Sequence, residues 1–331
     1  MPGLLEQPGE SPFLLADGAW GSAFIAQGLD LDREPAEAWN LRHGERVAEL
    51  ARHYARSADL LTTNTFGANR IRLARFGLED RLRMINTRGV EIARRAGNSR
   101  KGDGGPLLIG GAIGPVRGVG AGTPGDAAIA AVYEEQAACL LEAGADFVVV
   151  ETMCEPAEAA IAIRAARAVG ARLVVCTFAF RETAPGTFAT WSGASVEAAL
   201  MTASDSGADI TGANCVPASP SLLTLIERMR ACAGASPLWL KPNAGEPVKT
   251  GPEAVAGHAT RRTVLSHLRR FWRPDCPAPL WHYPHPLTDE GFIGRILDAL
   301  GHGVIGGCCG TTPSDIARIR RVIAFRTGAP R

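Results

Sequence analysis

The sequence predicts a single closed (β/α)8 TIM barrel of the α/β class, with an insertion between its seventh and eighth strands. Eight short apolar runs rich in Val, Ile and Leu have the composition of buried parallel strands, and segments of helical periodicity lie between them. Alternating strands and helices form a parallel sheet, and eight such units close into a barrel. An open doubly wound sheet is the alternative, but it more often has fewer strands and a Gly-rich phosphate loop after the first one.

The expected strands and helices follow one another regularly along the chain. The strands are expected at Phe13–Ala16, Asp59–Thr63, Leu107–Gly111, Phe147–Glu151, Leu173–Phe178, Ile210–Cys215, Leu238–Pro242 and Gly303–Gly307. The helices are expected at Glu45–Ser57, Arg81–Ala96, Ala127–Ala143, Glu155–Val169, Val196–Ser206, Ser221–Ala233, Glu290–Leu300 and Asp315–Phe325. A small residue followed by Ala-Asp precedes three strands, at Ser57, Gly144 and Gly207, and fits a helix C-cap that leads into the next strand.

The segment from Val248 to Pro286 breaks this alternation. It is rich in Pro, His and Arg, is long for a crossover, and has one amphipathic stretch over Arg261–Trp272. We interpret it as an insertion (248–286) within one barrel domain that spans 1–331. Such insertions often shape a substrate entrance, so it either takes part in substrate selection or only covers the barrel rim.

Three residues of this insertion are metal-ligating types. Cys276, His282 and His285 lie close together in the sequence. They do not follow a standard zinc spacing, so we interpret them as ordinary loop residues rather than a second metal site.

Composition and charge exclude several classes of protein. The chain has 331 residues, 46% hydrophobic residues and a net charge of +1, which indicates a folded protein without a nucleic-acid signature. No apolar run is long enough to span a membrane, and the N-terminus has no signal-peptide pattern. Eight cysteines are few for a disulfide scaffold of this length, so we expect a cytoplasmic protein whose clustered thiols serve metal binding or catalysis.

Two adjacent cysteines give the strongest chemical signal. Cys308 and Cys309 end the last expected strand, within GVIGGCCGTTPSDI at 303–316. Neighbouring side chains in a regular strand point to opposite faces, so the strand must bend for both sulfurs to reach one metal. Gly306, Gly307 and Gly310 permit that bend. Taken alone, the pair fits buried core cysteines equally well.

A third cysteine favours the metal. Cys215 ends the sixth expected strand, and the carboxyl ends of barrel strands converge on one mouth. Three cysteine ligands leave a fourth tetrahedral position open, as in catalytic zinc sites, and sulfur ligands select zinc.

Two acids occupy corresponding places at the same mouth. Asp17 follows the first strand and Glu151 ends the fourth. Asp17 alone fits a turn or a helix N-cap before Gly18. A carboxylate at the end of an apolar strand is costly to bury unless it is paired, so Glu151 indicates a site for a cationic ligand group.

Seven motifs, collinear over nearly the whole chain, carry a family resemblance. They are DGAWGS at Asp17–Ser22, ADLLTTNTFGAN at Ala58–Asn69, GAIGP at Gly111–Pro115, GADFVVVET at Gly144–Thr152, GANC at Gly212–Cys215, PNAGEP at Pro242–Pro247 and GGCCGTTP at Gly306–Pro313. With them the chain resembles the homocysteine S-methyltransferases, whose zinc-dependent homocysteine-binding domain also serves betaine-dependent and cobalamin-dependent methionine synthesis.

The resemblance implies a set of site residues. It implies zinc on Cys215, Cys308 and Cys309, with the sulfur of homocysteine as the fourth ligand and Asn243 in that position when substrate is absent. Asp17 and Glu151 would then hold the ammonium of homocysteine, and the backbone amides of Gly18, Ala19 and Trp20 would suit its carboxylate. Zinc lowers the pKa of a bound thiol, so no further catalytic residue is required.

The methyl donor is less defined than the acceptor. The betaine branch has a tyrosine after the strand-four glutamate, where this chain has Thr152, which disfavours betaine. A methylsulfonium such as S-methylmethionine is the expected donor, and a separate methylated corrinoid protein is the alternative. Another thiol acceptor, or a non-catalytic barrel with a structural zinc, are the rival functions. We expect no nucleic-acid or membrane partner.

Overall fold

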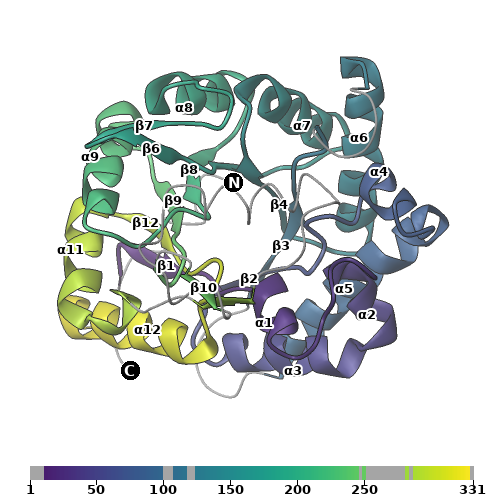
Figure 1. The fold of residues 1–331 in the computed structure, drawn as a ribbon, viewed down its shortest axis with the longest axis horizontal. Helices are drawn as coiled ribbons and strands as arrows, with labels where there is room; N and C mark the ends of the chain where they lie inside the picture. Colours follow the sequence, from purple (N-terminus) through teal and green to yellow (C-terminus); the bar gives the residue numbers. More distant parts are fainter. Residues whose placement is uncertain are drawn as a thin grey trace.

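Eight parallel strands form a closed barrel surrounded by helices, as predicted (Figure 1). The computed structural model describes residues 11–99, 107–117, 124–245, 248–250, 280–282 and 286–328. In the order in which they pair, the strands are β1 (Phe13–Leu15), β12 (Gly303–Ile305), β9 (Leu238–Lys241), β8 (Ile210–Asn214), β5 (Val174–Phe178), β4 (Phe147–Met153), β3 (Leu108–Ile113) and β2 (Leu60–Thr62). A parallel bridge between Ala16 and Leu60 joins the two ends of this order and closes the barrel.

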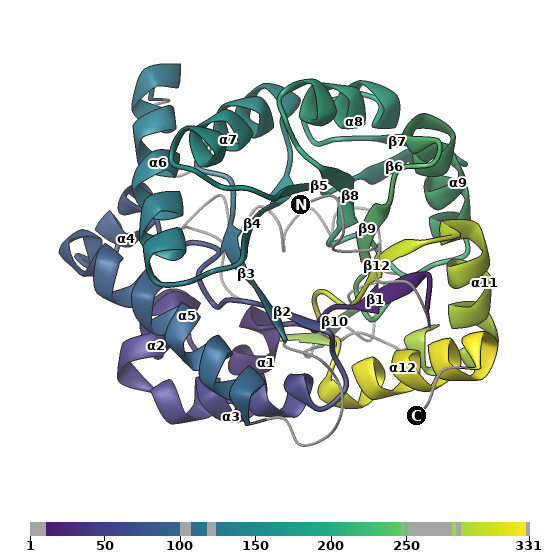
Figure 2. The ribbon, with the colours of Figure 1, turned by 180° about the vertical axis from the view of Figure 1, so that it is seen from behind.

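The helices form an outer ring around the strands (Figures 1 and 2). The long ones lie within two residues of the expected ends: α3 (Gly44–Ala55), α5 (Leu82–Asn98), α6 (Asp126–Glu142), α7 (Pro156–Ala168), α8 (Val196–Asp205), α9 (Ser221–Ala233), α11 (Glu290–Leu300) and α12 (Pro313–Thr327). Shorter helices that the sequence did not predict are α1 (Gly21–Ile25), α2 (Trp39–Arg42), α4 (Arg70–Ala74) and the 3-10 turns η1 (Ala36–Ala38), η2 (Glu79–Arg81) and η3 (Pro286–Thr288).

The amino ends of three strands carry a repeated polar arrangement. Asp59, Asp146 and Asp209 each accept, at 2.7 Å, the backbone N–H of the neighbouring strand. Each also forms an ion pair with an arginine of an outer helix, namely Arg320, Arg94 and Arg167. These are the aspartates of the Ala-Asp motifs, and the glycines before two of them have positive φ, as the C-cap interpretation requires. The aspartate of each motif therefore connects the start of its own strand to the neighbouring strand and to an outer helix, on the face opposite the barrel mouth.

The barrel interior is filled by side chains rather than hollow. Phe147 and Trp239 pack edge to face inside it, with ring centroids 6.0 Å apart. Gly110 makes room for Phe147, because a Cβ at that position would lie 2.7 Å from the ring. Space for a ligand is consequently found at the carboxyl ends of the strands, where TIM-barrel active sites lie.

An antiparallel ribbon that the sequence did not predict lies between β5 and α8. It consists of β6 (Arg181–Ala184) and β7 (Thr187–Ala189). Its strands are short and lack the apolar composition by which the barrel strands were recognised.

A second antiparallel ribbon lies within the segment predicted to be an insertion, near its two ends. β10 (Val248–Thr250) pairs with β11 (Leu280–His282), with Val248 opposite His282. The helix expected over 261–272, together with Cys276 and His285, lies outside the described residues.

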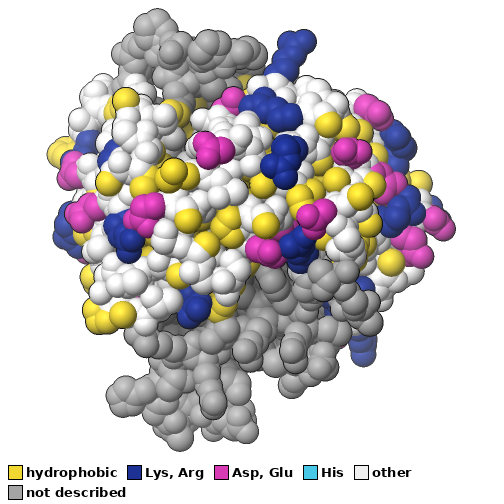
Figure 3. Space-filling view, turned by 90° about the horizontal axis from the view of Figure 1, so that it is seen from above, with side chains coloured by type: hydrophobic (Ala, Val, Ile, Leu, Met, Phe, Trp, Pro, Cys, Tyr) yellow, Lys and Arg dark blue, Asp and Glu magenta, His cyan; other side chains and the backbone are white. Residues whose placement is uncertain are grey.

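The described surface of the barrel has mixed charge. On the face in Figure 3, Lys and Arg side chains are interspersed with Asp and Glu. None of the described helices has the length and apolar character needed to cross a membrane.

Candidate active site

Three cysteines from two regions of the chain meet at the barrel mouth. Cys215 directly follows β8, and Cys308 and Cys309 follow β12. Their sulfur atoms all lie within 4.8 Å of one another, and Cys215 Sγ is 3.8 Å from Cys309 Sγ. That distance is far beyond the roughly 2.05 Å of a disulfide, so the sulfurs are available as ligands. The expected convergence of the three thiols is confirmed as geometry.

The backbone after β12 bends as the glycines predict. Gly306 and Gly307 donate their N–H groups to the carbonyls of Leu240 and Asp17, on the two neighbouring strands. A Cβ on Gly307 would lie 2.4 Å from Thr311 Oγ1, and one on Gly306 would lie 2.8 Å from the Ala16 Cβ. Side chains cannot fit at these two positions, which is why glycines precede the cysteine pair.

Helix α12 anchors the far side of this bend. Thr312 is its N-cap and forms a capping box with Asp315, and Pro313 occupies the first turn. Thr311 Oγ1 donates to the carbonyl of Cys308 at 2.7 Å. The loop that holds Cys308 and Cys309 is thus fixed from both sides.

Cys215 has an unusual backbone conformation. Its φ is +54°, and Thr152, which follows the glutamate of β4, has φ of +62°. These are the two non-glycine residues with positive φ in the described part of the chain, and both line the same cavity. Such conformations cost about 1–3 kcal/mol each and cluster at functional sites.

The sulfurs of the cluster shift one another's pKa values. Hydrogen bonding with Cys308 and Cys309, together with burial, raises the pKa of Cys215. The same hydrogen bonding lowers the pKa of Cys308, and nearby Lys241 adds to this effect. A sulfur cluster with one already stabilised thiolate is a suitable ligand set for zinc.

Asn243 lies next to this cluster with an unsatisfied acceptor. Its side chain is 2% exposed, and its Oδ1 atom has no hydrogen-bond partner. Its backbone N–H donates to the carbonyl of Val216, and the following Ala244 donates to the carbonyl of Cys309. A buried amide oxygen without a partner costs free energy, and coordination to a cation would satisfy it.

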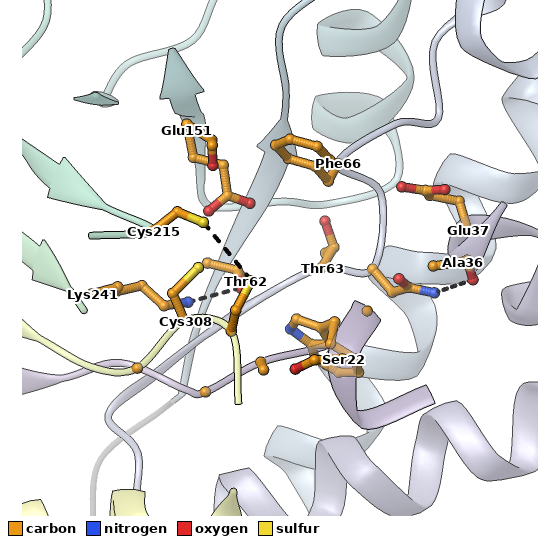
Figure 4. A pocket seen from close by; sticks show the side chains of 18 of the residues that line it. Ser22, Ala36, Glu37, Thr62, Thr63, Phe66, Glu151, Cys215, Lys241 and Cys308 are labelled. Atoms are coloured by element: carbon orange, nitrogen blue, oxygen red, sulfur yellow. Dashed lines mark hydrogen bonds between the residues drawn. The ribbon is translucent and has the colours of Figure 1, made fainter. Parts of the chain in front are cut away.

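The sulfurs open into a cavity at the carboxyl ends of the barrel strands. Figure 4 shows Cys215, Cys308, Lys241 and Glu151 on one side of it and Phe66 and Glu37 on the other. Further lining residues include Gly18, Ala19, Trp20, Ser22, Thr62, Thr63, Asn64, Thr152 and Cys309.

Glu151 lines the cavity near the sulfurs. Burial raises the pKa of its carboxyl group to about 8, although Lys241 acts in the opposite direction. A carboxyl group held in so unfavourable a setting is typical of a ligand-binding site.

Asp17 is buried behind the cavity wall and does not line it. Its two oxygens accept four hydrogen bonds, from Trp20 Nε1 at 3.0 Å, Thr62 N at 2.8 Å, Thr62 Oγ1 at 3.0 Å and Lys241 Nζ at 2.6 Å. We expected Asp17 to contact the ammonium of a ligand directly. Its carboxylate, however, is already saturated by hydrogen bonds from the protein itself.

The loop after β1 also differs in part from the expectation. Gly18, Ala19 and Trp20 line the cavity, as the resemblance implied. The amide of Ala19, however, donates to Thr311 Oγ1 at 3.1 Å and is engaged within the protein.

Asn214 connects the acid and the thiols and was not singled out from the sequence. Its Oδ1 accepts from Thr152 N at 2.8 Å and from Thr177 Oγ1 at 2.7 Å. Its Nδ2 donates to Thr152 Oγ1 at 2.7 Å and lies 3.5 Å from Glu151 Oε2 and 3.9 Å from Cys308 Sγ. Asn214 is a polar residue at the end of an apolar strand, and this feature of the sequence could have identified it as a site residue.

Comparisons with known proteins agree with this site. The sequence profile described as "Homocysteine S-methyltransferase" matches residues 14–323. The chain belongs to the homocysteine S-methyltransferase family. The family predicted from the motifs is thereby confirmed.

Two sets of known proteins are similar to this chain. The chain is 28% identical over 326 residues to methionine synthase of Mycobacterium tuberculosis and 29% identical to that of Mycobacterium leprae. The match covers 94% of this chain. The chain spans only 24% of the length of either methionine synthase. The fold is similar to that of the homocysteine methyltransferase MmuM from Escherichia coli, with a TM-score of 0.69 and 21% identity for the metallated form, over 94% of this chain and 96% of that one. For the oxidized form the TM-score is 0.72 at 21% identity, over 97% and 98%.

Proposed function

We propose that this protein transfers a methyl group to the sulfur of homocysteine, giving methionine, at a zinc ion held by Cys215, Cys308 and Cys309. The observation that carries the proposal is the three-sulfur cluster at the mouth of a homocysteine S-methyltransferase barrel. Zinc, when bound, lowers the pKa of the substrate thiol so that the thiolate can attack a methyl group. The orphaned Oδ1 of Asn243 supports its assignment as the fourth ligand when substrate is absent.

Glu151 is the proposed partner of the substrate's ammonium. It lines the cavity beside the sulfurs, and its buried carboxyl group gains a counter-ion when an ammonium binds. Gly18 and Trp20 line the same cavity, and their backbone is the proposed contact surface for the acceptor. Asp17 acts behind this surface through its hydrogen-bond partners.

The proposed donor is a methylsulfonium such as S-methylmethionine. Phe66 and Glu37 lie across the cavity from the sulfurs (Figure 4), and an aromatic face and a carboxylate both suit a cationic group. The alternative donor, a methylated corrinoid on a separate protein, is favoured by the similarity to mycobacterial methionine synthases. We place the protein in the cytoplasm because its cysteine cluster needs a reducing compartment.

A donor panel tests the proposal. Zinc-loaded protein is incubated with homocysteine and with S-methylmethionine, S-adenosylmethionine, a methylcorrinoid or betaine, and methionine is quantified. We expect turnover with S-methylmethionine and none with betaine. Methylation of a different thiol in preference to homocysteine would correct the acceptor. Absence of turnover and of homocysteine binding, with zinc tightly held by four protein ligands, would favour the non-catalytic barrel.

A further inference from the structure

Lys241 is the one basic side chain among the described residues that line the cavity. It ends β9, and its side chain is 4% exposed. Its Nζ atom donates to Asp17 Oδ1 at 2.6 Å. The same atom lies 3.4 Å from Thr62 Oγ1, which Figure 4 shows beside it. An ammonium group has three protons, so these two partners leave one for a ligand in the cavity.

Asp17 holds this ammonium group in a fixed place. Its remaining acceptor positions are filled by Trp20 and Thr62, so the carboxylate has no freedom to turn towards the cavity. The ion pair joins the ends of β1 and β9 in the barrel wall. Breaking it would leave a buried charge without a partner, which makes the pair rigid.

Lys241 and Glu151 present opposite charges to one cavity. Both line the cavity together with Cys308, and each charge favours the ionised form of the other group by shifting its pKa. The carboxylate and ammonium of an α-amino acid are carried by the same carbon, so they need an anionic and a cationic partner side by side. The amide of Ala19, an expected partner for the carboxylate, is engaged by Thr311.

We propose that Lys241 binds the α-carboxylate of the amino-acid thiol, while Glu151 binds its ammonium and Asp17 positions Lys241. The inference rests on the proposed function and extends it to acceptor specificity. It makes both charged groups of homocysteine necessary for recognition, with the sulfur directed at the cysteine cluster.

Truncated acceptors test this assignment. 3-Aminopropane-1-thiol is homocysteine without its carboxylate, and 4-mercaptobutanoate is homocysteine without its ammonium. A charge-assisted hydrogen bond contributes enough that wild-type kcat/KM should fall about tenfold to a hundredfold for 3-aminopropane-1-thiol. In Lys241→Met the preference for homocysteine over 3-aminopropane-1-thiol should shrink to about twofold or less. The preference for homocysteine over 4-mercaptobutanoate should be kept.

Two further variants make the result specific. Glu151→Gln should show the reverse pattern, losing the preference over 4-mercaptobutanoate and keeping that over 3-aminopropane-1-thiol. Asp17→Asn combined with Lys241→Met removes both charges of the buried pair, so it folds without an unpaired charge and should behave as Lys241→Met does. Zinc content and the thermal midpoint are measured for every variant.

The outcomes separate the inference from the function. If the Lys241 variants lose kcat/KM equally for homocysteine and for 3-aminopropane-1-thiol, Lys241 is only the counter-ion of Asp17 and the inference is overturned. If wild type neither binds nor methylates homocysteine, the proposed function itself fails.

Discussion

Replacement of Asn214 by alanine should both destabilise the protein and weaken homocysteine binding. The Asn214 side chain is buried and makes three short hydrogen bonds, to Thr152 N, Thr152 Oγ1 and Thr177 Oγ1. Alanine would leave the Thr152 N–H without an acceptor, which costs about 1–3 kcal/mol, and would remove two further net contributions of about 1 kcal/mol each. We therefore expect the free energy of unfolding to fall by about 3–5 kcal/mol.

Binding should suffer because Thr152 is strained. Its φ of +62° is unfavourable for a β-branched residue, and the Asn214 side chain holds it there. Without that support the turn after β4 relaxes and moves the adjacent Glu151. We expect a higher KM for homocysteine with zinc still bound.

Urea unfolding and homocysteine titration measure the two effects. Thr177→Val is the matched control, because it removes one of these hydrogen bonds and leaves Thr152 held; it should cost about 1 kcal/mol and spare KM. An Asn214→Ala variant within 0.5 kcal/mol of wild type (roughly the usual range for a neutral surface change) would refute this reasoning.

Four further predictions concern the metal, the acid, the barrel base and the insertion. Cys308→Ala should lose zinc and activity together by metal analysis, whereas Cys232→Ala, on the exposed side of α9, should keep both. The Glu151 pKa of about 8 means that the folded metal-free protein keeps a proton that the unfolded chain loses above its usual pKa of 4.5. The free energy of unfolding should therefore fall, as the pH rises between these values, by up to about 1.4 kcal/mol per pH unit. Glu151→Gln should remove this dependence in urea titrations at pH 5 to 8. Asp209→Ala should cost about 1 kcal/mol in unfolding and leave KM for homocysteine unchanged, since it acts at the opposite end of the barrel. A short loop in place of 248–286 should alter the kinetic constants of the donor but not zinc content or homocysteine affinity; unchanged donor constants would show that the insertion has no part in donor choice.

The barrel could be predicted because each of its strands leaves a local signal. Buried parallel strands are continuous apolar runs, and Gly144 and Gly207 mark helix ends before two of them. The ribbon of β6 and β7 has no such signal, because most of its residues are exposed or half-buried and its pairing depends on a turn. The three thiols were predictable for a similar reason, since the carboxyl ends of barrel strands always meet.

The polar contacts behind the cavity could not be predicted from local pattern. Asp17 and Lys241 are 224 residues apart, and nothing in the sequence near Asp17 shows that its carboxylate will form an ion pair with a lysine. A signal existed at the other partner: Lys241 is a charged residue at the end of an apolar strand, the same pattern that identified Glu151. Applied to Lys241 and Asn214, that criterion would have placed both at the site.

Methyl transfer to labelled homocysteine tests the central claim most directly. Zinc-loaded protein is given S-methylmethionine and homocysteine labelled with carbon-13 throughout its skeleton, and the products are analysed by mass spectrometry. We predict labelled methionine from wild type and none from Cys308→Ala. Unmodified labelled homocysteine after incubation of fully zinc-loaded wild type with S-methylmethionine, S-adenosylmethionine or a methylcorrinoid would contradict the account.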